Sequence, residues 1–142
     1  MLLKKQRNWK INNMKLKLTI VDLDGVYFQG EVDLLNITVA SGTITILANH
    51  LPLISNIKIS HCYIKEDGVI TNFAIAGGTL FVSETECKII TSAIEKETEI
   101  DFSRAQKAKE RAEKRLNAKD EDVDIKRAEI ALKRAINRLS LK

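Results

Sequence analysis

Apolar and polar positions follow two different periods along this chain of 142 residues. From Met14 to about Thr98 the period is two, as where Leu16 and Leu18 alternate with Lys17 and Thr19. After Thr98 the period changes to about 3.6. Because side chains alternate between the two faces of a strand and recur on one helix face every three or four residues, the change predicts strands followed by helices.

Short runs rich in β-branched residues divide the first segment, and turn signals separate them. The predicted strands cover residues 16–20, 32–39, 42–47, 73–76, 80–82 and 88–91. The turn signals are Asp24-Gly25, Ser41-Gly42, Asp67-Gly68 and Gly77-Gly78. Many short strands at this spacing are typical of an antiparallel sandwich or barrel.

The second segment contains one pattern twice, D-x2-R-A-x5-R-A-x2-R-L, at residues 101–116 and again 23 positions later at 124–139. Asp101 and Asp124 are the expected N-caps, since an aspartate carboxylate accepts hydrogen bonds from the free N–H groups of a helix start. The polar residues 117–123 connect the two copies. The sequence therefore predicts two helices of similar length in an antiparallel hairpin.

The predicted fold is an all-β N-terminal sandwich plus an α-helical C-terminal hairpin. We expect three parts: a basic N-terminal extension at 1–13, a sandwich domain at 14–98 and a two-helix domain at 99–142. Residues 1–13 lack the apolar core of a signal peptide, so they are either a true extension or precede a start at Met14. The formal charges of residues 1–13, 14–100 and 101–142 are +4, −5 and +5, which predicts that the basic tail docks on the acidic body or on an acidic partner.

Each copy of the repeat places three arginines on one helix face, because positions i, i+7 and i+11 lie on the same side of a helix. We call these six residues the arginine ladder: Arg104, Arg111, Arg115, Arg127, Arg134 and Arg138. No member has an acid four residues away, and only Arg104 and Arg127 have one three residues away. A neighbouring row of alanines predicts close but weakly stabilising packing between the helices.

Two readings of the ladder remain open at this point, a solvated helix face and an anion site. Guanidinium groups bind phosphates in a bidentate manner, which favours an anion. The tail's one aromatic residue is Phe102, so base stacking on nucleic acid is disfavoured relative to a polyphosphate nucleotide or an acidic protein loop.

Other chemistry is not indicated: the sequence predicts no catalytic and no metal-binding residue. It lacks a nucleophile-elbow motif and a phosphate-binding glycine loop. His50 and His61 have no cluster of ligands near them, and Cys62 would point to the opposite face of a strand from His61. Cys62 and Cys87 are expected as buried thiols rather than a disulfide.

Two segments resemble the epsilon subunit family of F-type ATP synthase, bacterial type. Residues 42–53, GTITILANHLPL, are similar to the family's G-x-x-G-I-x-x-x-H-x-P-L segment, and residues 73–82, FAIAGGTLFV, resemble its strand–Gly-Gly–strand hairpin. The resemblance spans residues 14–139. Thr45, Asn49 and Ser60 stand where the family often has glycine, which brings local turn geometry into question.

The resemblance also implies a regulatory ATP site. Ile100 to Ala105 match the motif I/L-D-x-x-R-A, which binds ATP in members of the Bacillus type. By the same resemblance the ATP-binding residues would be Glu95, Asp101, Arg104, Arg111, Arg134 and Arg138, with Arg115 and Arg127 as possible further contacts. ATP would be a regulatory ligand, and no cofactor would be required.

The implied function is that of a non-catalytic central-stalk subunit of a proton-translocating ATP synthase. The sandwich would bind the gamma subunit and the c-subunit ring, with His50 and Thr43 facing the ring. The hairpin would fold on the sandwich with ATP and otherwise extend toward the alpha and beta subunits, inhibiting hydrolysis. We expect a peripheral protein at the cytoplasmic face of a bacterial membrane, associated through the complex and binding no nucleic acid. A purely structural hairpin that binds only protein partners is the main alternative.

Overall fold

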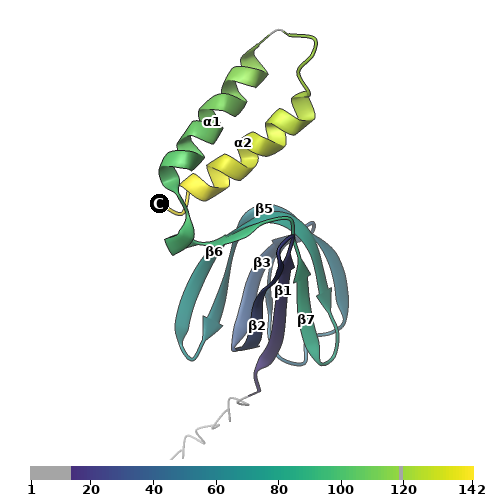
Figure 1. The fold of residues 1–142 in the computed structure, drawn as a ribbon. Helices are drawn as coiled ribbons and strands as arrows, with labels where there is room; N and C mark the ends of the chain where they lie inside the picture. The colour runs from purple at the N-terminus through teal and green to yellow at the C-terminus, as the bar shows by residue number, and fades with distance from the viewer. Residues whose placement is uncertain (1–13, 119) are drawn as a thin grey trace, which may run out of the picture.

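The computed structural model describes residues 14–118 and 120–142, so the predicted extension at 1–13 lies outside the described residues. A β-domain precedes two helices that rise from one end of it as an antiparallel pair (Figure 1). The strands are β1 (Leu16–Asp22), β2 (Gly25–Val32), β3 (Leu34–Val39), β4 (Gly42–Ile46), β5 (Leu53–Glu66), β6 (Val69–Val82), β7 (Glu86–Ile90) and β8 (Ile94–Lys96). The 3-10 helix η1 (Glu97–Glu99) leads to α1 (Phe102–Asn117) and α2 (Ile125–Leu139).

The strands pair in the order β2-β1-β7-β6-β5-β3-β4, and β8 pairs with β6. Neighbours are antiparallel, as predicted, except that β1 and β7 run parallel. The sheet folds over on itself, and alternate side chains from its two layers meet in one apolar core (Figure 1). Phe73, Leu18 and Ile20 are among the largest fully buried side chains. The predicted sandwich is confirmed.

The prediction of a turn at Gly77-Gly78 is wrong, because β6 runs through both residues. Both glycines have positive φ, 86° and 136°, and they bend the strand instead of ending it. Before the bend β6 pairs with β8, and after it with β7. The bend therefore lets one 14-residue strand serve both parts of the sheet.

The predicted strand 32–39 is interrupted at Asp33. Val32 ends β2 and Leu34 begins β3, because Asp33 leaves the pairing with β1 and its N–H donates to the carbonyl of Lys65. The Asp33 carboxylate also forms an ion pair with Lys15, which lowers the pKa of Asp33. The strands β2, β5 and β8 lie outside the predicted ranges.

The residues that replace the family's glycines fit their places. Asn49 takes the left-handed conformation, with φ of 60°, that favours glycine and that asparagine also tolerates. Thr45 lies in β4, where its hydroxyl accepts a hydrogen bond from Asn36. Ser60 lies within β5 and makes no turn. None of the three disturbs the fold.

Both helices begin where the sequence predicts. The Asp101 carboxylate accepts a hydrogen bond from the backbone N–H of Arg104 at 2.9 Å, and Asp124 does the same for Arg127 at 3.0 Å. The buried residues of α1 and α2 are alanines, two on each helix, at 105, 112, 128 and 135. Alanine permits a close approach but buries little apolar area, so the hairpin is weakly stabilised by its own packing.

Candidate functional site

The ladder arginines of α1 face solvent. Arg104 and Arg111 line a shallow groove of about 570 Å³ along α1, beside Asp101. The other residues that line this groove are Ser103, Lys107, Glu110 and Lys114. Within the described ranges 14–118 and 120–142, neither Arg104 nor Arg111 makes an ion pair. These two guanidinium groups are therefore available to an anion.

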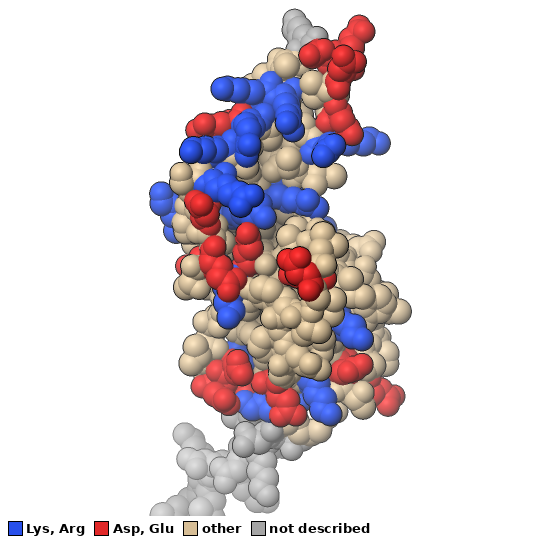
Figure 2. All heavy atoms as spheres, in the orientation of Figure 1, with Lys and Arg blue, Asp and Glu red and all other residues tan. Residues whose placement is uncertain are grey.

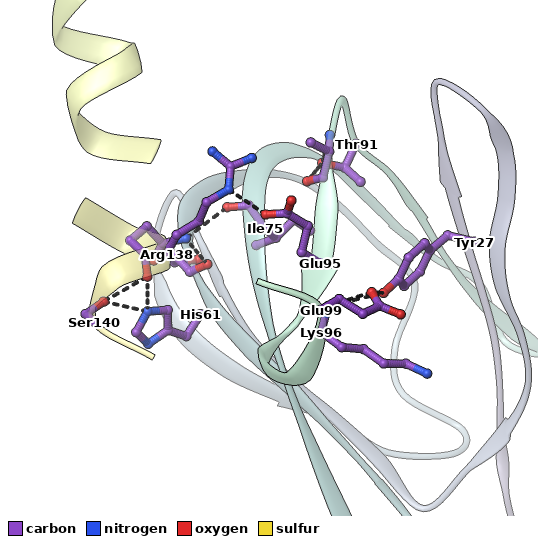
Figure 3. A network of polar contacts seen from close by, with 12 residues as sticks. Tyr27, His61, Ile75, Thr91, Glu95, Lys96, Glu99, Arg138 and Ser140 are labelled. Atoms are coloured by element: carbon purple, nitrogen blue, oxygen red, sulfur yellow. Dashed lines mark hydrogen bonds and ion pairs between the residues drawn. The ribbon is translucent and has the colours of Figure 1, made fainter. Parts of the chain in front are cut away.

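The ladder arginines near the end of α2 instead reach the sandwich. Arg138 Nε forms an ion pair with Glu95 Oε2 on β8 at 2.5 Å (Figure 3). Arg134 Nη2 donates to the hydroxyl of Ser92 at 3.3 Å, while its Nε is buried without a hydrogen-bond partner. A buried N–H without an acceptor is costly, so the contact of Arg134 with the sandwich leaves one of its donors unsatisfied.

Arg115 and Arg127 lie farther from the sandwich, toward the loop between the helices. Neither forms an ion pair with any residue that the structure describes. Lys and Arg side chains gather over the visible face of the hairpin, with acidic side chains at its base and at its tip (Figure 2). The structure thus brings two predicted arginines, Arg134 and Arg138, to the junction of the two domains, where Arg138 pairs with the predicted acid Glu95, whereas Arg104 and Arg111 line a separate groove along α1 with Asp101.

Two contact networks at this junction were not predicted. In the first, Tyr27 on β2 donates its hydroxyl hydrogen to Glu99 Oε2 at 2.7 Å (Figure 3). The backbone N–H of Lys96 donates to the Tyr27 hydroxyl oxygen and to Glu99 Oε2, each at 3.2 Å. The hydrogen bonds lower the pKa of Glu99, and burial raises the pKa of Tyr27. This Tyr27–Glu99 tether fixes η1, which joins the domains, to the sandwich.

The second network joins the last turn of α2 to β5. His61 Nε2 donates to the Asn137 carbonyl and to the Ser140 hydroxyl, both at 2.8 Å (Figure 3). The Asn137 amide in turn donates to the Ser60 carbonyl. No sequence signal identifies such contacts, since they join side chains to backbone atoms far apart in the chain.

Of the two residues expected to face a ring of c subunits, Thr43 lies in β4 and His50 lies in the segment that follows it. Thr43 is exposed near the start of the strand, where its hydroxyl contacts that of Thr38 at 2.9 Å. His50 is half-buried in the segment after the strand, and its Nδ1 donates to the Leu51 carbonyl at 2.7 Å. Both side chains are accessible to a partner.

The remaining reactive side chains do not form a site. His61 is exposed while Cys62 is buried, as the predicted strand alternation requires. Burial raises the pKa of Cys62 and Cys87 to about 12, so both thiols stay protonated at neutral pH. Among the described residues, no group of His, Cys, Asp and Glu could hold a metal ion. The helices of this part of the chain are all too short or too polar to cross a membrane.

Comparison with known proteins accounts for both domains. The model of the delta/epsilon chain β-sandwich domain of ATP synthase matches residues 15–97, and that of the delta/epsilon chain long α-helix domain matches residues 98–142. This chain belongs to the ATP synthase delta/epsilon family. The predicted resemblance is thereby confirmed.

Similar proteins agree with this membership. The ATP synthase epsilon chain of Caldicellulosiruptor bescii is 40% identical over 127 residues, which cover 89% of this chain and 93% of that protein. The epsilon chain of Halalkalibacterium halodurans is 38% identical over the same length and is covered to 96%. The chain is an epsilon-type, non-catalytic subunit of the ATP synthase central stalk.

A solved structure shows the same fold at greater distance. It is a chain of the Euglena gracilis mitochondrial ATP synthase, determined by cryo-electron microscopy as an OSCP/F1/c-ring assembly. The TM-score is 0.73 at 27% identity, over 84% of this chain and 76% of that one. The two-domain arrangement is therefore shared with a subunit of an assembled ATP synthase.

Proposed function

We propose that this subunit helps couple rotation to ATP synthesis and inhibits ATP hydrolysis through a hairpin that senses ATP. The observation that carries the proposal is the arginine ladder, in which Arg104 and Arg111 are unpaired and Arg134 retains a buried N–H without an acceptor. Guanidinium groups at this density favour a polyphosphate ligand. ATP-binding family members of the Bacillus type, which the sequence resembles, give the ligand its identity.

Each proposed contact has a distinct task. Arg104 and Arg111 bind phosphate oxygens from α1, and Arg134 and Arg138 approach from α2. Asp101 holds the start of α1 and so positions Arg104, since its carboxylate accepts from the backbone N–H of that residue. Glu95 already pairs with Arg138 and orients its guanidinium group. Arg115 and Arg127 extend the cationic face beyond the ligand.

The hairpin suits a two-state switch because alanine packing stabilises it only weakly. A gap of a few kcal/mol between docked and extended states can be reversed by a ligand that binds only one of them. A ligand at about 100 times its Kd contributes about 2.7 kcal/mol. ATP at the base of the hairpin would favour the docked state and permit hydrolysis.

The proposal assigns one group of partners to each domain. The sandwich binds the gamma subunit and the c-subunit ring, with His50 and Thr43 facing the ring. The extended hairpin presents its basic face to acidic loops of the alpha and beta subunits. The subunit would then lie at the cytoplasmic face of a bacterial membrane, held there by the complex and binding no nucleic acid.

Calorimetric titration of the full chain with Mg-free ATP tests the sensor. We expect saturable one-to-one binding that Arg104→Ala abolishes or weakens at least about tenfold, since charge-assisted hydrogen bonds contribute about 1.5–3 kcal/mol each. Lys109→Ala is the matched control, because it removes one positive charge from the same helix outside the ladder. No binding heat at millimolar ATP, or equal losses in both variants, would contradict the proposal.

The second candidate is a structural coupling subunit whose hairpin binds only proteins. The ion pair between Arg138 and Glu95 favours it, because this arginine already has a partner in the docked state. The same titration separates the candidates, since a protein-only hairpin gives no heat with ATP.

A further inference from the structure

The hairpin touches the sandwich through polar contacts of one helix only. In the part of the chain that the structure describes, every hydrogen bond or ion pair between the two domains beyond η1 involves α2 or its C-cap, Ser140. The hydrogen bonds recorded for side chains of α1 stay within that helix or its cap. Docking is therefore decided at the last turns of α2.

Asn137 lies at the centre of these contacts. Its amide nitrogen Nδ2 donates to the Ser60 carbonyl at 2.8 Å and is 3.4 Å from the Ile75 carbonyl. Ser60 and Ile75 are directly opposed residues of β5 and β6. One side chain of α2 thus bonds the backbone of both long strands, close to the bend at Gly77-Gly78.

The backbone of Asn137 completes the connection. A carbonyl in the last turn of a helix has no partner within the helix. Here the Asn137 carbonyl accepts hydrogen bonds from His61 Nε2 at 2.8 Å and from the Ser140 hydroxyl at 2.9 Å. Ser140 in turn accepts from His61 Nε2. The Asn137 amide therefore bonds the strand carbonyls, while the side chains of His61 and Ser140 satisfy its backbone carbonyl.

We propose that Asn137, with His61 and Ser140, is a latch that holds the hairpin docked without nucleotide. The latch uses no ladder arginine, so it is separate from the groups that would bind ATP, although Asn137 precedes Arg138 directly. Asn137 is thus a positioning residue that places Arg134 and Arg138 beside Ser92 and Glu95. This inference rests on the proposed two-state hairpin, in which ATP favours the docked state and contact with the alpha and beta subunits favours the extended one.

The test measures the distance between the domains in the full chain. Spin labels are attached to two introduced cysteines, Glu84→Cys on the sandwich and Glu121→Cys at the hairpin tip. Pulsed electron paramagnetic resonance then measures the distance between the two labels. The native thiols stay unlabelled because they are buried and protonated. Without ATP, the labelled chain with no further substitution should give a single distance between the labels, that of the docked hairpin.

Asn137→Ala should lower the ratio of docked to extended molecules at least about fivefold, since one net hydrogen bond contributes about 1 kcal/mol. Alanine favours helix more than asparagine does, so helix loss would not explain the change. Asn117→Ala at the other end of the hairpin is the matched control and should leave the distance unchanged. Asn137→Asp keeps the shape but removes both N–H donors, and it should behave like the alanine variant.

Three outcomes would overturn the latch: an unchanged distance in Asn137→Ala, docking retained in Asn137→Asp, or an extended native hairpin without ATP. Adding ATP to the same samples tests the proposed sensor separately. ATP should return Asn137→Ala toward the docked distance. A chain that docks through Asn137 but ignores ATP would retain the latch and remove the sensor.

Discussion

Gly78 lies where β6 passes directly against the chain that leaves β7. A Cβ added at Gly78 would come within 2.1 Å of the Ile90 carbonyl oxygen, far inside contact distance. Its φ of 136° is also strained for any residue with a side chain. Thr91, a buried threonine just after β7, donates its hydroxyl hydrogen to the Gly77 carbonyl at the same bend. At this position the backbone itself is part of the packing.

We expect Gly78→Ala to destabilise the fold by about 2–4 kcal/mol, because the collision is with backbone atoms that cannot move aside. Urea denaturation followed by circular dichroism measures the loss. Gly68→Ala is the control, since Gly68 has a φ of 83° but open space around its Cβ position. It should cost about 1–2 kcal/mol from the backbone conformation alone. Equal losses in the two variants would show that strain, not collision, decides.

At the scale of the element, the two helices have the same N-cap but different surroundings. Asp101 caps α1 beside the sandwich, and Asp124 caps α2 at the far end of the hairpin. Each cap satisfies one of the free N–H groups of its helix and contributes about 0.5–2 kcal/mol. Only Asp101 also lies in the groove with Arg104 and Arg111.

Asp101→Ala should therefore reduce both the helix content and the affinity for ATP, whereas Asp124→Ala should reduce mainly the helix content. Circular dichroism and ATP calorimetry on both variants check this directly. An Asp101→Ala chain with unchanged helix content and unchanged ATP affinity would exclude the double role of this carboxylate.

At the scale of the whole molecule, the Tyr27–Glu99 tether decides where the domains can pivot. Because η1 is bonded to β2, the proposed movement of the hairpin would be confined to the residues between Glu99 and the start of α1 at Phe102. The hydrogen bonds from Tyr27 and Lys96 favour the ionised carboxylate, so the folded-state pKa of Glu99 lies below its ordinary value near 4.5. The contribution of this carboxylate to the free energy of unfolding is present at pH values above 4.5, and it is lost as the pH falls through the lowered pKa.

Tyr27→Phe should speed amide hydrogen exchange at Lys96–Ile100 relative to the unchanged chain at pH 6–7. The difference between the two chains should shrink as the pH falls below 4.5 and through the lowered pKa of Glu99, where the carboxylate becomes protonated. Tyr63→Phe is the control, since the Tyr63 hydroxyl makes no hydrogen bond to the residues that the structure describes. Exchange that is equally fast in both variants would argue against the tether.

The sequence by itself determined the two periods, and with them the sandwich, the hairpin, both N-caps and the arginine ladder. These features follow from spacing within one element, where side-chain direction is fixed by the backbone. It did not determine β2, an edge strand with mostly accessible side chains, because the alternation of apolar and polar positions is weak when neither face of a strand is well buried.

Only the tertiary structure decided the rest. A pair of glycines marks either a turn or a bend, and Gly77-Gly78 became a bend because β5, β7 and β8 all pair with the same strand. Likewise, nothing local joins Asn137 to Ser60 or Tyr27 to Glu99, since these contacts link positions more than 70 residues apart. Patterns within an element are readable from the chain, whereas hydrogen bonds between elements exist only once the backbone has been placed.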